Sequence, residues 1–196
     1  ASCAKTEDNS VAPGEYYPIT VTDQAGREVV IEEEPEKLVS GYYISTSALI
    51  ALDLDDKMVG IEAKANKRAI YSLSAPELIE LPSVGTAKEF DLEGCAALEP
   101  DLVILPMKLK DAAETLTSLG IDVLLVNPEN GELLDGMIDL IAQAAGCPEK
   151  AEELRKFTEE RETWRKSLQM RTSPRYISQA IPPCFPRQGM PCISPI

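Results

Sequence analysis

The sequence contains no histidine. That absence removes the most common general base, the most common nitrogen ligand for metals and every catalytic triad that depends on histidine. The short motifs of nucleotide and acyl chemistry are also missing, because no strand is followed by GxGxxG and neither GxxxxGK[ST] nor GxSxG occurs. We therefore predict that the protein is not an enzyme and carries no resident cofactor or metal.

Long apolar runs and an excess of basic residues are missing as well. No stretch of about 18 apolar residues occurs, so the sequence predicts no transmembrane helix. The 33 acidic residues outnumber the 19 basic ones and give a formal net charge of −14. This charge argues against nucleic acids and anionic membrane surfaces as partners of the surface as a whole. With 196 residues, 44% of them apolar, the chain can bury the core of one domain.

Short apolar segments of strand length alternate with segments of helical pattern. The run from Asp101 to Leu105 lies between two prolines and has no alternating polar face, which is typical of a strand buried on both sides of a parallel sheet. We expect further strands at 37–40, 57–61 and 121–126, and helices at 45–54, 91–98, 110–119 and 133–145. This alternation predicts an α/β fold, with a Rossmann-like parallel sheet flanked by helices.

Two other elements flank this sheet in the sequence. Two alternating segments, 17–22 and 27–31, surround a turn that contains Gly26, so we expect an N-terminal β-hairpin. From Pro148 the sequence becomes strongly helical, and proline suits the first turn of a helix. Apolar residues are sparse in this segment, so we expect a long C-terminal helix that is half exposed.

The stretch from Val84 to Pro106 carries a recognisable pattern. It begins with Val84-Gly85, continues with Asp91-Leu92-Glu93 and ends with the motif PDLVI at 100–104. This pattern resembles the periplasmic substrate-binding proteins of ABC importers for ferric siderophores, haem and cobalamin. The resemblance extends from about Tyr17 to about Trp164 and implies one lobe of a normally two-lobed protein.

The resemblance divides the chain into four parts: a tether at 1–16, an α/β binding lobe at 17–147, an interlobe helix at 148–169 and a tail at 170–196. The start resembles a bacterial lipoprotein processing site, so we expect Cys3 to carry lipid and the protein to be anchored outside the cytoplasm. Such proteins continue into a second lobe, whereas the tail changes composition abruptly. We interpret the tail as a frame change or truncation, with a natural short variant as the alternative. We expect ligand binding to be weak or absent, and self-association through the exposed interlobe face.

The candidate ligand contacts follow the predicted strands, because ligands of open α/β sheets bind beyond the carboxyl ends of the strands. They are Tyr42 and Tyr43 after the first core strand, Lys67 and Arg68 after the second, Thr86 and Lys88 in the next loop, and Met107 and Lys108 after the strand that ends at Leu105. The alternative is that the basic residues are ordinary solvated loop residues and that one tyrosine packs on the helix below.

A basic rim on an acidic body favours an anionic ligand. Haem-binding members of the family that the chain resembles tend to have a methionine where Lys88 stands, and a protonated lysine cannot ligate iron. Cobalamin-binding members often place an aromatic residue in the same loop, where the nearest aromatic here is Phe90. We therefore expect a ferric siderophore as the ligand, with cobalamin second.

The resemblance also assigns a partner. In this family the glutamate that corresponds to Glu93 faces the membrane permease and pairs with its arginines, a geometry that suits carboxylate and guanidinium groups. The alternative is an exposed helix glutamate without a role. Two other classes of function stay open: a Rossmann-like cofactor-binding domain, which would need a glycine-rich phosphate loop, and an interaction module outside transport.

Overall fold

The computed structural model describes residues 16–171, with side chains described as far as residue 168. The chain divides into two units between Arg155 and Lys156. Cys3 and nearly all of the predicted tether and tail lie outside the described residues. The bounds of the four predicted parts stay a prediction.

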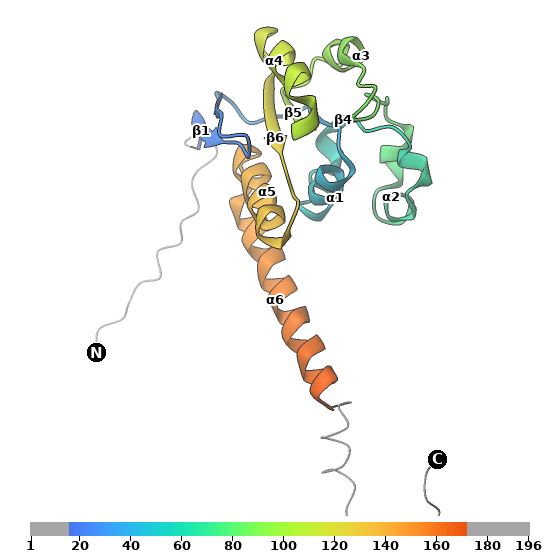
Figure 1. Ribbon diagram of the computed structural model, residues 1–196, viewed down its shortest axis with the longest axis vertical. Helices are drawn as coiled ribbons and strands as arrows, with labels where there is room; N and C mark the ends of the chain where they lie inside the picture. The colour runs from blue at the N-terminus through green and yellow to red at the C-terminus, as the bar shows by residue number, and fades with distance from the viewer. Residues whose placement is uncertain (1–15, 172–196) are drawn as a thin grey trace, which may run out of the picture. The chain divides into compact units, whose positions relative to one another are not determined.

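The core of the first unit is a parallel sheet of four strands (Figure 1). Its order is β4 (Met58–Gly60), β3 (Leu38–Ser40), β5 (Leu102–Pro106) and β6 (Asp122–Val126). Val103 of β5 pairs with Val39 on one side and Val123 on the other. All five residues of β5 are buried, as expected for a strand that lies between helices on both faces.

Helices cover both faces of this sheet (Figure 1). On one face, α1 (Tyr43–Ala51) and α5 (Gly131–Ala144) pack against Leu102 and Ile104. On the other face, α3 (Leu92–Ala97) and α4 (Lys110–Ser118) pack against Val103 and Leu105. Successive residues of a strand point to opposite faces, so one apolar run supplies both cores. The predicted Rossmann-like α/β fold is confirmed.

Side-chain caps and left-handed glycines set the helix ends. Asp91 accepts a hydrogen bond from Gly94 N at 2.8 Å and caps α3. Asn130 accepts one from Leu133 N at 2.8 Å, so α5 begins two residues before the predicted start. Gly120 and Gly146 have positive φ of 84° and 72° and follow the ends of α4 and α5, as C-terminal glycines do.

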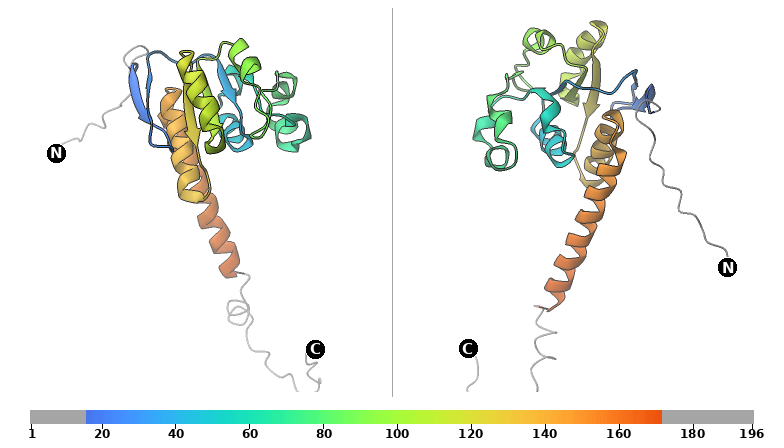
Figure 2. Two further views of the ribbon diagram at one scale, coloured as in Figure 1. Left: turned by 45° about the horizontal axis from the view of Figure 1, so that its top comes forward. Right: turned by 180° about the vertical axis from the view of Figure 1, so that it is seen from behind.

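The predicted hairpin is confirmed as β1 (Ile19–Thr22) and β2 (Glu28–Ile31). Its turn lies against β6, the strand at one edge of the sheet (Figure 2). Asp23 Oδ2 accepts from Leu125 N at 3.1 Å, and Gln24 Oε1 accepts from Asn127 N at 2.6 Å. An edge strand exposes unpaired backbone groups, and here the hairpin turn satisfies the amide of Leu125 and the carbonyl groups of Val123 and Leu125.

The segment after β4 differs from the prediction. The sequence predicts no helix between residues 61 and 91, whereas the structure has the 3₁₀ turn η2 (Ala65–Lys67), the helix α2 (Ala69–Ser74) and the 3₁₀ turn η3 (Pro76–Glu80). Tyr71, Ala75 and Leu78 are fully buried. Helices this short are stabilised by packing, and the local sequence does not reveal that packing.

The long helix α6 runs from Pro148 to Arg171, with proline at its start as predicted. Ala151 is buried in the first unit. In the second unit the large apolar side chains of Phe157, Trp164 and Leu168 are exposed, which agrees with the predicted half-exposed helix. No helix within residues 16–171 is long and apolar enough to cross a membrane. Two further 3₁₀ turns, η1 (Asp55–Lys57) and η4 (Met107–Leu109), complete the list of elements.

Candidate ligand-binding site

The carboxyl ends of β3, β4, β5 and β6 meet at one edge of the sheet, which we call the carboxyl edge. Tyr42 and Tyr43 follow β3, Arg68 lies a few residues after β4, and Met107 follows β5 directly. The loop that contains Gly85 joins this edge, because Gly85 O accepts a hydrogen bond from Ala63 N at 2.7 Å. The parallel topology therefore brings all the predicted segments to the same edge.

A buried carboxylate lies at this edge. Glu62, two residues after β4, is only 5% exposed. Its Oε2 accepts from the Thr46 hydroxyl at 2.7 Å, and its Oε1 accepts from the Tyr71 hydroxyl at 2.8 Å. A buried charge is unfavourable unless it is paired and hydrogen-bonded, and these two donors supply part of that compensation.

Arg68 supplies the rest of the compensation for the buried Glu62 carboxylate. Its Nε lies 3.2 Å from Glu62 Oε1 but is not aligned for a hydrogen bond. Its guanidinium carbon lies 4.3 Å from the centre of the Tyr43 ring, within the range of a cation–π contact. The side chain is 35% exposed, and no hydrogen bond links its terminal nitrogens Nη1 and Nη2 to another residue between 16 and 168. We refer to Tyr43, Glu62, Arg68 and Tyr71 as the Arg68 site.

Burial raises the pKa of two tyrosines at this edge, Tyr71 and Tyr42. Burial, followed by the nearby Glu62 carboxylate, raises the pKa of Tyr71. Burial is also the main cause that raises the pKa of Tyr42, with Tyr43 next. At neutral pH both side chains are uncharged phenols that can donate hydrogen bonds.

The two predicted tyrosines have different surroundings. Tyr43 is 43% exposed and lies under the Arg68 guanidinium. Tyr42 is half-buried and packs against the core that α1 and α5 cover. Their rings meet edge to face, with centroids 5.0 Å apart. Tyr43 is therefore the more accessible candidate, and Tyr42 fits the alternative in which one tyrosine packs on the helix.

The other predicted contacts lie at the carboxyl edge without joining this cluster. The Thr86 hydroxyl accepts from Lys88 N at 3.2 Å and from Glu89 N at 3.1 Å, so it shapes its own turn. The side chains of Lys67, Lys88, Met107 and Lys108 are exposed. Their part in ligand binding stays a prediction.

Glu93 lies in the first turn of α3 and is exposed, so its carboxylate is accessible to a partner. The sequence reasoning missed Glu62, Thr46 and Tyr71. Glu62 is one acid among 33, and nothing near it in the sequence distinguishes it from the solvated ones.

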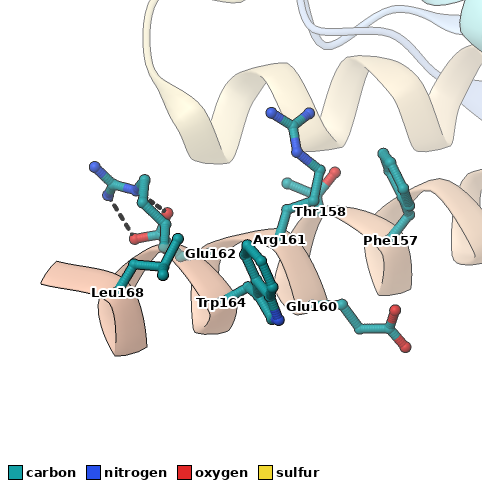
Figure 3. Close-up of a pocket in the computed structure, with 8 residues that line it drawn as sticks. Phe157, Thr158, Glu160, Arg161, Glu162, Trp164 and Leu168 are labelled. Carbon is teal, nitrogen blue, oxygen red and sulfur yellow. Dashed lines mark hydrogen bonds and ion pairs between the residues drawn. The ribbon is translucent and has the colours of Figure 1, made fainter. Parts of the chain in front are cut away.

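A shallow hollow also lies along α6 in the second unit (Figure 3). Phe157 and Trp164 line it, with Trp164 69% exposed. Arg165 Nη2 pairs with Glu162 Oε1 at 2.7 Å, and Arg161 lies 5.7 Å from the Phe157 ring. This surface belongs to a single helix and contains no buried polar group, so the Arg68 site is the stronger candidate for ligand binding.

Comparisons with known proteins bear on the family and the fold of the chain. A family model described as "Periplasmic binding protein" matches residues 38–167. The chain is 31% identical over 145 residues to the uncharacterized ABC transporter substrate-binding lipoprotein YvrC of Bacillus subtilis strain 168, a match that covers 71% of this chain and 44% of that protein.

Solved structures show the same fold. A periplasmic solute binding protein from Veillonella parvula has 28% identity and a TM-score of 0.69, and the match covers 80% of this chain and 49% of that one. Staphylococcus aureus SirA, complexed with staphyloferrin B, has 18% identity and a TM-score of 0.64, over 78% of this chain and 51% of that one. The chain therefore spans about half the length of the relatives it matches.

Proposed function

The chain belongs to the periplasmic binding protein family, and we propose that it acts as the solute-binding component of an ABC importer that captures a negatively charged ferric siderophore. Members of this family are substrate-binding proteins, which are not enzymes. The observation that carries the proposal is Arg68, whose guanidinium is fixed on one side by Glu62 and on one face by Tyr43, while Nη1 and Nη2 point to no protein partner within residues 16–168.

This arrangement suits an anionic chelate for a physical reason. A guanidinium presents its N–H groups as a planar fork that matches paired oxygens, such as those of a carboxylate or a catecholate. Because Arg68 is only about one-third exposed, its attraction for an anion is screened less than that of a fully solvated lysine. Tyr43 adds an exposed aromatic surface beside the charge.

The relatives support the class of function more than the ligand. The Bacillus subtilis relative is named as an ABC transporter substrate-binding lipoprotein. SirA is in complex with staphyloferrin B, whereas other proteins of the same fold are named for molybdate or haem binding. The choice of a ferric siderophore therefore rests on the Arg68 site, and cobalamin is the alternative ligand.

Delivery and anchoring complete the proposal. The exposed carboxylate of Glu93 would pair with arginines of a membrane permease. Cys3 would carry the lipid that holds the protein at the outer face of the cytoplasmic membrane or in the periplasm. Self-association through the exposed interlobe face stays a prediction of the same account.

The proposal is tested by a titration followed by NMR, which detects weak binding and so suits a chain that spans about half the length of its relatives. The probe is a trianionic tricatecholate chelate of gallium(III), the diamagnetic counterpart of the ferric complex. Arg68→Ala should weaken binding roughly tenfold or more, because a hydrogen bond to a charged group contributes about 1.5–3 kcal/mol and 1.4 kcal/mol is about tenfold.

The matched control is Lys37→Ala. It also removes one positive charge, but Lys37 precedes β3 and so lies at the opposite edge of the sheet. Equal affinities of the Arg68→Ala and Lys37→Ala variants would contradict the proposal. Tighter binding of cobalamin than of the chelate would move the assignment to the alternative ligand.

A further inference from the structure

Glu62 is the buried carboxylate of the Arg68 site. It is one of two buried carboxylates among residues 16–168, the other being Asp23 in the hairpin turn. Its oxygens receive hydrogen bonds from Thr46 of α1 and Tyr71 of α2. Glu62 therefore links α1 and α2 at the carboxyl edge, beside the direct bond in which the Tyr71 hydroxyl donates to Tyr43 O at 3.2 Å.

The same carboxylate fixes the near side of Arg68. Arg68 is the residue just before α2, with φ −101° and ψ 105°, so its side chain leaves the backbone at the junction between η2 and α2. The Nε side of the guanidinium lies 3.2 Å from Glu62 Oε1, and its flat face lies over Tyr43. These two contacts restrict both the position and the tilt of the guanidinium plane.

We propose that Glu62 is a positioning residue, which holds the Arg68 guanidinium in the orientation that receives the anionic ligand. This inference rests on the proposed function, because it concerns the same site. Thr46 and Tyr71 hold the carboxylate by hydrogen bonds, the carboxylate attracts the guanidinium through the 3.2 Å ion pair at Nε, and Nη1 and Nη2 remain for the ligand. A group fixed before binding loses less conformational freedom when the ligand arrives.

A competing effect has the opposite sign. Glu62 also neutralises part of the positive charge of Arg68, so its removal would raise the local potential and favour an anion. If neutralisation dominates, Glu62→Gln binds the anionic chelate more tightly than the wild type. If positioning dominates, the same variant binds it more weakly. The direction of the change therefore distinguishes the two roles.

The test compares Glu62→Gln with Asp23→Asn in the full chain. Each variant replaces a buried carboxylate that lies beside an arginine with its amide, but Asp23 lies in the hairpin turn beside β6. The first readout needs no ligand: the Nε–Hε NMR signal of Arg68 should shift toward the signals of solvated arginines and broaden in Glu62→Gln, and stay in place in Asp23→Asn.

The second readout is the affinity for the gallium(III) tricatecholate. Glu62→Gln should weaken binding by about tenfold, the size expected for residues within one interaction network. In an Arg68→Ala background the same substitution should have no further effect, because Glu62 acts through Arg68. Tyr71→Phe keeps the ring and removes the hydroxyl that donates to Glu62 and to Tyr43 O. It should move the Arg68 signal in the same direction, and it replaces Glu62→Gln as the test if that variant does not fold.

Three results would overturn the inference: an unchanged Arg68 signal in the Glu62 and Tyr71 variants, tighter binding by Glu62→Gln, or an equal loss of binding in the Arg68→Ala background. Failure of the wild type to bind the chelate contradicts the proposed function instead. The Arg68 signal then decides by itself whether Glu62 positions the arginine.

Discussion

A buried acid lies beside an arginine twice in the first unit, and the two pairs differ in whether the arginine has groups left without a hydrogen-bond partner. Arg27 donates to Asp23 through Nε at 2.8 Å and to Val123 O through Nη2 at 2.9 Å. Asp23 itself accepts from three backbone amides, those of Ala25, Arg27 and Leu125. The hydrogen-bonding groups of this pair named above already have partners within the protein. In the other pair, the terminal nitrogens of Arg68 have no hydrogen-bond partner within residues 16–168, which is why we assign ligand binding to it.

The hairpin pair should therefore matter for stability. Asp23→Ala removes the carboxylate and leaves Arg27 and the amide of Leu125 without their partner. We expect a loss of about 3 kcal/mol in the free energy of unfolding, because breaking a buried pair costs roughly 3–5 kcal/mol and Arg27 retains some access to water. Denaturation with urea measures this loss.

Glu33→Ala is the control for that experiment, because it removes an exposed acid from the segment after the same hairpin. It should change the free energy of unfolding by less than about 0.5 kcal/mol. Equal effects of the two substitutions would mean that Asp23 does not stabilise the hairpin against β6.

The residues of the site differ in how well the sequence predicts them. Tyr43 and Arg68 could be named because strand ends can be located from the apolar runs, and ligands bind beyond them. Glu62 could not be named, because its role depends on its contacts with Thr46 and Tyr71. Tyr71 in turn lies on α2, which the sequence did not predict as a helix.

At the level of elements, the strands of the sheet were predicted well because they are apolar on both faces. β5 and β6 lie within one residue of their predicted bounds, since prolines and a glycine mark their ends. α2 and η3 were missed because three buried side chains, Tyr71, Ala75 and Leu78, hold them in place. Helices with an internal pattern can be predicted locally, whereas helices that depend on packing cannot.

The start of β6 predicts a pH effect. Asp122 is half-buried at the first position of the strand, and burial, followed by the carboxylates of Glu32 and Asp101, raises its pKa above the ordinary 3.8. Because the pKa is higher in the folded state, the folded protein favours the protonated carboxyl. The resulting stabilisation is fully present below pH 3.8 and is lost as the pH rises through the folded-state pKa.

Asp122→Asn should therefore be more stable than the wild type at pH 7, by about 0.5–1 kcal/mol. The difference should disappear near pH 3, where the wild-type carboxyl is protonated. Thermal unfolding between pH 3 and pH 7 measures it, with Asp135→Asn on the exposed side of α5 as the control. A difference that grows as the pH falls would contradict the assignment.

At the scale of the whole molecule, the net charge of −14 repels an anionic ligand at long range. Any affinity for an anion must therefore come from local groups at the carboxyl edge, where Arg68 is the partly buried one. The sequence predicted this edge as the binding surface from topology alone. It could not decide which of the basic residues is held by other side chains, because that depends on contacts between separate elements.

The most direct test asks which residues of the wild-type chain bind a metal chelate, and whether a negatively charged chelate binds more tightly than an uncharged one. Amide NMR signals are followed during titration with the trianionic gallium(III) tricatecholate and with an uncharged gallium(III) trihydroxamate. Our account predicts shifts that concentrate in the segments after β3, β4 and β5, largest at Tyr43 and Arg68, and tighter binding of the trianion. Equal binding of the two chelates, or shifts that spare the carboxyl edge, would contradict it.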